Sequence, residues 1–214
     1  MTVHLWDHKL SYVSIPKVAC TSIKRMFFEI ENGRRFEPFK INGQDMHIHK
    51  LYPRMSFSDL PHARMANNTR LTLVRDPIKR LLSCYSNRVV HYKELSLKKA
   101  GPALKKAGLK PNPDLSLFLE RFEDYRAASY SIKHHSRPMV ALIGRDPAYY
   151  DEVYSLAQID AFAERVGKIV GRPVQLPHGQ TGGPKISPDV LTTAQVDFIR
   201  NYYAEDYAIW GKYT

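Results

Sequence analysis

A lysine and two hydroxyl side chains lie close together near the start of the chain, in the segment Pro16-Lys17-Val18-Ala19-Cys20-Thr21-Ser22. Its small residues would let backbone amides approach an oxyanion, and its lysine would place a cation beside that anion's terminal group. The segment lacks the glycines and the lysine position of a nucleoside-triphosphate P-loop, and GxxxxGK[ST] occurs nowhere in the chain. These residue types favour binding of a phosphate-like oxyanion, with an ordinary structural loop as the alternative.

Arg75 and Ser83 have the spacing of a strand end and the helix that follows it. Residues 70–74 form an apolar, β-branched run typical of a buried strand, and Pro77 falls where the first turn of a helix tolerates proline. An arginine at the end of a parallel strand projects into the crevice where open α/β sheets bind ligands, and its planar fork suits a phosphate monoester. Asp76 is predicted to be a charge at the helix N-terminus rather than a catalyst.

His49 and His47 are the candidates for a general base, in that order of preference. Alternation along a strand would place both rings on one face, and an imidazole with a pKa near ~6.5 suits proton abstraction at neutral pH. The alternatives are His91, His135 or a carboxylate, and an ordinary structural role for both histidines. Two histidines without a third ligand do not indicate a metal site, so no metal is expected.

The motifs belong to two predicted strand–loop–helix units. Residues 11–15 form the first strand, and Thr21 or Ser22 is expected to cap the helix that runs to about residue 29. The second unit is the strand at 70–74 followed by a helix at 78–92. Further predictions are helices at 115–126, 157–170 and 192–203, a strand at 152–156, and no regular structure at 176–188. This order predicts an α/β fold with a central, mostly parallel sheet flanked by helices, and no domain boundary is evident.

The composition is that of a basic globular protein. Of 214 residues, 43% are hydrophobic and 25% are charged, which excludes a disordered or fibrous chain. Lys and Arg number 32 against 21 Asp and Glu, a net charge of +11 that favours an anionic ligand or partner. Much of this charge lies in residues 79–110, and 95–113 is interpreted as a basic, mobile insertion. That stretch could bind an anionic glycan, bind nucleic acid, or be only a solvated face.

Two expectations concern the compartment of the protein. No apolar run approaches the ~18 residues of a membrane span, and the first residues lack the apolar stretch of a secretory signal. The two cysteines, Cys20 and Cys84, cannot form a disulfide framework, so a reducing, cytoplasmic compartment is the default expectation. Cys84 is predicted to lie in the core.

The two anion-binding motifs together resemble those of the sulfotransferase family. The 16–22 segment is similar to that family's 5′-phosphosulfate loop, and Arg75-Asp76-Pro77 through Ser83 and Tyr85 is similar to its 3′-phosphate motif. The likeness is greatest to carbohydrate sulfotransferases of the HNK-1, chondroitin and heparan 2-O types. Residues 153–156 and 202–207 resemble the family's C-terminal half, so the resemblance covers nearly the whole chain.

This resemblance implies a P-loop-like three-layer fold and an enzyme that transfers a sulfuryl group from 3′-phosphoadenosine 5′-phosphosulfate (PAPS) to a hydroxyl of a carbohydrate-type acceptor. Transfer would proceed by in-line displacement without a metal, and Lys17 would stabilise the leaving oxygen. In the heparan 2-O-sulfotransferases a similar His-x-His segment carries the base. The implied donor-binding residues are Lys17, Val18, Ala19, Cys20, Thr21, Ser22, Arg75, Ser83, and Gly182 and Gly183 in a 178–185 loop that could close over adenosine.

The resemblance leaves the acceptor undecided. Residues 132–139 match the family's Asn/Asp-x-His-Trp-x-Pro-Gln segment only at His135 and Pro138. The acceptor is therefore expected to be a glycan, a glycolipid or a small molecule with a hydroxyl, anionic or neutral. The alternative function is a P-loop-like nucleotide-binding protein without sulfuryl turnover, either kinase-like or a module that binds anions or nucleic acid.

Overall fold

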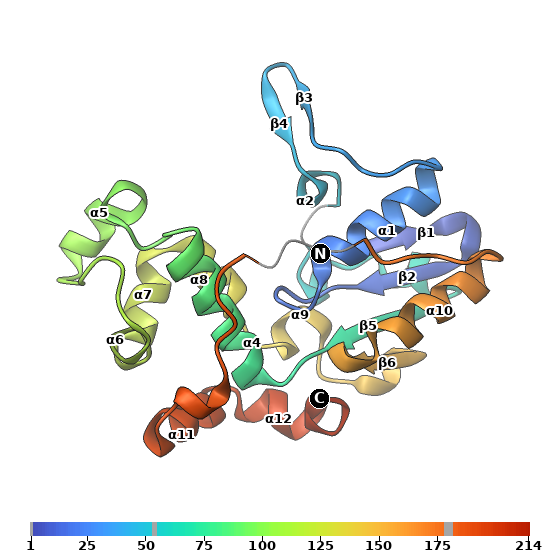
Figure 1. Ribbon diagram of the computed structural model, residues 1–214. Helices are drawn as coiled ribbons and strands as arrows, with labels where there is room; N and C mark the ends of the chain where they lie inside the picture. The colour runs from blue at the N-terminus through green and yellow to red at the C-terminus, as the bar shows by residue number, and fades with distance from the viewer. Residues whose placement is uncertain (1, 53–54, 178–181) are drawn as a thin grey trace. The chain divides into compact units, whose positions relative to one another are not determined.

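The computed structural model describes residues 2–52, 55–177 and 182–214 (Figure 1). The chain divides into two compact units, where the sequence showed no boundary. The first unit comprises Met1–Arg75, Met139–Gly179 and Ile209–Thr214, and the second comprises Asp76–Pro138 and Gln180–Ala208. No helix among the described residues is long and apolar enough to cross a bilayer.

A four-stranded sheet in the order β1-β2-β5-β6 forms the centre of the first unit. Its strands are β1 (Thr2–Leu5), β2 (Leu10–Val13), β5 (Thr69–Val74) and β6 (Glu152–Ser155). β1 is antiparallel to β2, whereas β2, β5 and β6 are parallel, as the two strand–loop–helix units predicted. Because Val13 pairs with Thr72, the carboxyl ends of β2 and β5 lie at one edge of the sheet.

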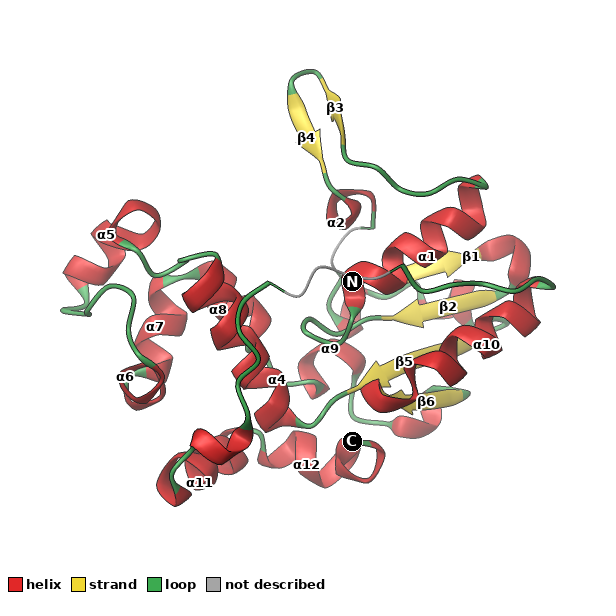
Figure 2. Cartoon of the chain, in the orientation of Figure 1, coloured by secondary structure: helices red, strands yellow, loops and turns green. Residues whose placement is uncertain are grey.

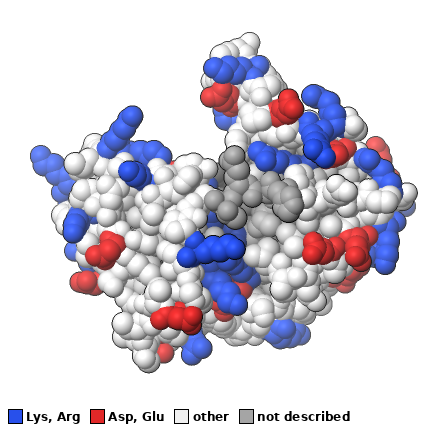
Figure 3. Space-filling model, in the orientation of Figure 1, with Lys and Arg blue, Asp and Glu red and all other residues white. Residues whose placement is uncertain are grey.

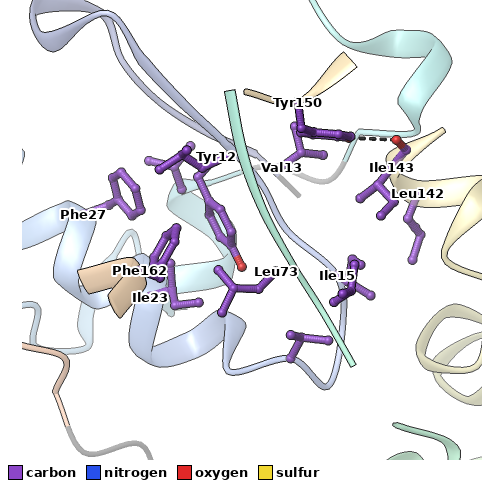
Figure 4. Close-up of a cluster of buried hydrophobic side chains, with 14 of the residues drawn as sticks. Tyr12, Val13, Ile15, Ile23, Phe27, Leu73, Leu142, Ile143, Tyr150 and Phe162 are labelled. Carbon is purple, nitrogen blue, oxygen red and sulfur yellow. Dashed lines mark hydrogen bonds between the residues drawn. The ribbon is translucent and has the colours of Figure 1, made fainter. Parts of the chain in front are cut away.

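Helices cover both faces of this sheet and complete three layers (Figure 2). The helices of the first unit are α1 (Cys20–Asn32), α2 (Ile48–Leu51), α3 (His62–Met65), α9 (Val140–Ile143) and α10 (Ile159–Val170). Tyr12 packs against Phe27 of α1 and Phe162 of α10, with ring centroids 5.7 and 5.3 Å apart (Figure 4). Val13 points to the opposite face, where Tyr150 and Ile143 lie.

A short hairpin joins α1 to α2. Its strands, β3 (Phe39–Ile41) and β4 (Gln44–Met46), pair antiparallel and lie outside the central sheet. His47 follows β4 directly and is the N-cap residue of α2.

The second unit is helical. It contains α4 (Pro77–Cys84), a π-helical continuation η3 (Tyr85–His91), α5 (Leu97–Lys106), α6 (Leu115–Glu120), α7 (Phe122–Ala128), α8 (Tyr130–His135), α11 (Thr193–Tyr202) and most of α12 (Ala204–Trp210). The Asp76 side chain caps α4 by accepting a hydrogen bond from the Lys79 amide at 2.8 Å, as the sequence predicted. Cys84 is fully buried, also as predicted.

Single turns of 3₁₀-helix complete the secondary structure. They are η1 (Trp6–His8), η2 (Phe57–Asp59), η4 (Pro147–Tyr149), η5 (Leu156–Gln158), η6 (Pro188–Val190) and η7 (Gly211–Tyr213).

Residues 95–113, predicted as a basic mobile insertion, contain the packed helix α5. Leu95, Leu104 and Leu109 are buried with the apolar side chains of the second unit, while the lysines of α5 are exposed. The helix forms despite Gly101 and Pro102 because apolar residues four positions apart give it a face to bury. In place of the single helix predicted at 115–126, the chain forms two helices, α6 and α7, that meet at Arg121.

Candidate functional site

The loop between β2 and α1 has an unusual backbone for residues that are not glycine. Lys17 has φ 69° and Ala19 has φ 47°, both in the left-handed region. Such a conformation costs about 1–2 kcal/mol for a residue with a β-carbon, and it is concentrated at functional sites. The 16–22 loop is therefore held in a shape that its own residue types disfavour.

The left-handed backbone of the 16–22 loop directs successive N–H groups at the start of α1 toward a common point. Ala19 is left-handed and is the N-cap of α1, and Cys20 begins the right-handed helix. A left-handed residue followed by a right-handed one turns successive amides toward a common point, which forms an anion-binding concavity. The prediction that Thr21 or Ser22 caps this helix is therefore wrong. Both hydroxyls lie inside the first turn, which contains no acidic residue, so that turn is compatible with an anion.

Arg75, at the end of β5, is bonded to the same loop. Its Nη1 donates a hydrogen bond to the Lys17 carbonyl oxygen at 3.0 Å. The contact joins the ends of two parallel strands and helps to fix the strained part of the 16–22 loop. The sequence motifs assign Arg75 and Lys17 to the same donor molecule, but they do not predict this hydrogen bond.

The two candidate bases lie beside the loop, but not on a strand. His47 is the extended N-cap of α2 and His49 is inside that helix, so the prediction of strand alternation was wrong. A β-strand has already ended at Met46. The rings nevertheless lie side by side, with centroids 5.4 Å apart and planes 16° from parallel. His49 is half-buried with its Nε2 3.0 Å from Thr21 Oγ1, whereas His47 is exposed.

Lys24 is a part of this site that the sequence analysis missed. Its side chain is fully buried, and its Nζ lies 3.4 Å from His49 Nδ1 and donates to the Tyr52 carbonyl oxygen at 3.0 Å. The available signal was its spacing, because Lys24 follows Thr21 by three positions and so shares a helix face with it. Thr21, His49 and Lys24 thus form one hydrogen-bonded cluster.

The other predicted donor-binding residues belong to the second unit. Ser83 is half-buried on α4. The Gly182 carbonyl oxygen accepts a hydrogen bond from Asn87 Nδ2 at 3.1 Å. A β-carbon on Gly183, whose φ is 92°, would clash with the Ser86 carbonyl oxygen, so this position requires glycine. Residues 178–181 of the predicted 178–185 loop lie outside the described residues.

The alternative histidine bases are also in the second unit. His135 is buried, with Nδ1 2.8 Å from the Ser131 carbonyl oxygen and Nε2 2.8 Å from Arg88 Nη2. Both ring nitrogens are engaged, which is typical of a structural histidine. His91 is exposed and packs edge-on against Tyr92. Among the described residues, no group of three His, Cys, Asp or Glu side chains could hold a metal ion.

Several known proteins are similar to part of this chain. Carbohydrate sulfotransferase 11 of Danio rerio is 35% identical over 86 residues, which cover 38% of this chain and 24% of that protein. Carbohydrate sulfotransferase 11 of Rattus norvegicus is 33% identical over 86 residues, which again cover 38% of this chain and 24% of that protein. Carbohydrate sulfotransferase 9 of Homo sapiens is 29% identical over 86 residues, 39% of this chain and 19% of that protein. The matched segment is thus about a quarter or less of each relative's length.

Similarity to a whole family extends further along the chain. No solved structure matches it significantly. The model of the sulfotransferase family, in contrast, matches residues 4–213. This match includes the 16–22 loop, Arg75, His47 and His49. The chain therefore belongs to the sulfotransferase family.

Proposed function

We propose that this chain is an enzyme that transfers a sulfuryl group from PAPS to a hydroxyl of a carbohydrate-type acceptor. The observation that carries the proposal is the 16–22 loop, where a left-handed backbone and Lys17 meet a helix N-terminus, an arrangement that suits an anion. Membership of the sulfotransferase family and the names of the similar proteins support sulfuryl transfer to carbohydrate.

The residues of the loop fit the 5′ end of the donor. The backbone amides at Ala19 and Cys20, with the Thr21 and Ser22 hydroxyls, would bind the 5′-phosphate. Arg75 and Ser83 would bind the 3′-phosphate, and Gly182 and Gly183 would allow close approach to the adenosine. We carry these roles over from the family's motifs, residue by residue.

The reaction needs one displacement at sulfur. The acceptor oxygen forms a bond to sulfur as the bond from sulfur to the bridging oxygen breaks, and the electron pair of that bond stays on the departing phosphate. The acceptor's hydroxyl proton passes to an imidazole of the His47–His49 pair. Lys17 stabilises the negative charge on the leaving oxygen, and the rest of catalysis is positioning. No metal ion is needed in this scheme.

The names of the similar proteins and the net charge of the chain support the proposed class of acceptor. Basic side chains form several separate groups on the visible face (Figure 3), and the chain has a net charge of +11. Such a surface suits a glycan, a glycolipid or another hydroxyl compound that carries acidic groups.

Labelled PAPS, incubated with the protein and a panel of neutral and anionic glycans, tests this function. We expect label to move to at least one glycan, with Lys17→Ala as the inactive control. Binding of adenosine 3′,5′-bisphosphate without any transfer would instead support a nucleotide-binding protein that lacks turnover. Magnesium-dependent ATP hydrolysis would support the kinase-like alternative.

A further inference from the structure

Three side chains form a continuous chain of contacts that begins at a buried cation and ends in the 16–22 loop. Lys24 has no exposed surface, and its Nζ lies 3.4 Å from His49 Nδ1. On the other side of the same ring, Nε2 lies 3.0 Å from Thr21 Oγ1. Both ring nitrogens of His49 are therefore in hydrogen-bond contact with side chains of α1.

The chemistry of these groups decides which nitrogen carries the proton. An ammonium group has three N–H donors and no acceptor, so it can bond only to a ring nitrogen that has a free lone pair. Lys24 already donates to the Tyr52 carbonyl oxygen at 3.0 Å and packs near the Tyr52 ring, 6.0 Å from its centroid, an environment that suits a cation. If its ammonium also donates to His49 Nδ1, the single proton of the neutral imidazole must be on Nε2.

We propose that Lys24 is a positioning residue that fixes His49 as the Nε2–H tautomer, so that His49 donates a hydrogen bond to Thr21 and His47 acts as the base. This inference rests on the proposed function and deepens it. It reverses the order of preference that the sequence suggested, because an Nε2 that already carries a proton cannot accept one from the acceptor.

The same arrangement gives His49 a role at the donor. In this arrangement the two hydrogen bonds of the His49 ring have the same direction, from the Lys24 ammonium to His49 and from His49 to Thr21. Thr21 Oγ1 accepts one bond, which leaves its own O–H to donate to an anion in the loop. Successive bonds of one direction strengthen one another, so the buried charge of Lys24 supports the anion site from a distance.

His47 has the properties that the base requires. Its side chain is exposed at the start of α2, where an acceptor can reach it, and its ring is stacked on the ring of His49. In the transfer step the acceptor oxygen bonds to sulfur, the bond to the bridging oxygen breaks, and His47 takes the hydroxyl proton. The electron pair of the broken bond remains on the phosphate oxygen beside Lys17.

Nitrogen-15 NMR of the histidine rings in the full-length protein tests the tautomer directly, without any turnover. We expect the Nε2–H pattern for His49 in the wild type at neutral pH, and a mixture of both tautomers in Lys24→Met. The matched control is Lys50→Met, because Lys50 is exposed and adjacent to His49 in sequence, with its Nζ bonded to the Asp45 carbonyl oxygen. Lys50→Met should keep the wild-type pattern. An Nδ1–H pattern for wild-type His49 would overturn the proposal.

Glutamine variants test the division of roles, and they remain informative if Lys24→Met does not fold. Glutamine can place an N–H near the position of Nε2–H but cannot act as a base. We expect His47→Gln to lower kcat by about 10²–10⁴, the usual contribution of a general base. His49→Gln should lower kcat by less than tenfold and mainly weaken binding of adenosine 3′,5′-bisphosphate.

The reverse order of losses in kcat would contradict the assignment. Failure of the proposed function gives a different result, in which the wild type transfers no sulfuryl group to any acceptor. In that case the NMR pattern still decides whether Lys24 sets the tautomer of His49.

Discussion

Lys17 has the most direct chemical role of the single residues, because it lies in the loop where negative charge would develop on the leaving oxygen. Its left-handed backbone, with φ 69°, fixes where the side chain begins. We expect Lys17→Ala to lower kcat by about 10²–10³, the scale of losing one pre-organised charge stabiliser. Initial rates with saturating PAPS measure this change, and a variant with near-wild-type kcat would remove Lys17 from the mechanism.

Arg75 is expected to act on binding more than on chemistry. It would bind the 3′-phosphate, and it also donates to the Lys17 carbonyl oxygen at 3.0 Å. Arg75→Ala should weaken binding of adenosine 3′,5′-bisphosphate about 10- to 100-fold, because hydrogen bonds to charged groups contribute roughly 1.5–3 kcal/mol. The matched control is Arg70→Ala on the same strand, where Arg70 pairs with Asp151 at 3.3 Å. Equal affinities for both variants would contradict this role.

The residues of the site could be predicted from the sequence only in part. Lys17, Thr21 and Arg75 were found because anion sites use cations and hydroxyls at the ends of parallel strands. Lys24 was missed because it lies among apolar helix residues, and sequence alone does not show that a lysine there is buried against a histidine. The orientation of His47 and His49 was also missed, since two residues separated by one can stack at a helix start as well as on a strand.

At the scale of elements, the junction between β2 and α1 matters most. Ala19 has φ 47° and ψ 19°, a left-handed backbone conformation that glycine adopts more easily than a residue with a β-carbon. We expect Ala19→Gly to raise the free energy of unfolding by about 1 kcal/mol through relief of this strain. Ala19→Val should lower it by about 1–2 kcal/mol, because a β-branched residue is a steric outlier there.

Urea unfolding of both variants measures these changes, and binding of adenosine 3′,5′-bisphosphate provides a second readout. Ala19→Val should weaken that binding more than Ala19→Gly does. Equal stability of the two variants would show that the left-handed conformation is absent in solution.

The central elements could be predicted well, because apolar β-branched runs and helical spacing identify buried strands and amphipathic helices. Strand β5 (Thr69–Val74) was predicted at 70–74, and helix α10 (Ile159–Val170) was predicted at 157–170. The observed and predicted ends of both elements agree to within two residues. Helix α5 was not predicted because Gly101 and Pro102 are helix breakers in isolation. Burial of Ala100 and Leu104 outweighs that local preference, and only the tertiary structure shows that burial.

At the scale of the whole molecule, stability should depend on pH through His4. Desolvation by burial, together with the nearby Arg64 charge, lowers the pKa of His4 from 6.5 to about 4. In the window between these values the unfolded chain binds a proton that folded His4 does not take up. The free energy of unfolding should therefore fall as the pH is lowered from 6.5 toward 4.

His4→Gln should flatten this part of the stability curve, since an amide can replace the 2.9 Å contact of Nδ1 with Ser11 Oγ without titrating. The matched control is His8→Gln, at an exposed position outside β1. Chemical unfolding at pH 7, 6 and 5 measures how steeply the free energy of unfolding changes with pH in each variant. If the free energy of unfolding of His4→Gln changed with pH as steeply as that of the wild type, other groups would control the pH dependence of stability in this range.

The whole chain could be predicted as a basic α/β protein, but its division into two units was not visible in the sequence. Two of the boundaries, at 75/76 and 138/139, lie within short connections that carry no composition change, and another, at 208/209, lies inside α12. Of the residues proposed to bind the donor, the 16–22 loop and Arg75 belong to the first unit, and Ser83, Gly182 and Gly183 belong to the second.

Calorimetric titration of the full-length protein with adenosine 3′,5′-bisphosphate is the most direct test of a donor-binding anion site. We expect saturable binding of one molecule per chain, weakened in Arg75→Ala and unchanged in Arg70→Ala. No detectable binding to the wild type, at concentrations where the protein remains folded, would contradict the assignment of PAPS as the donor.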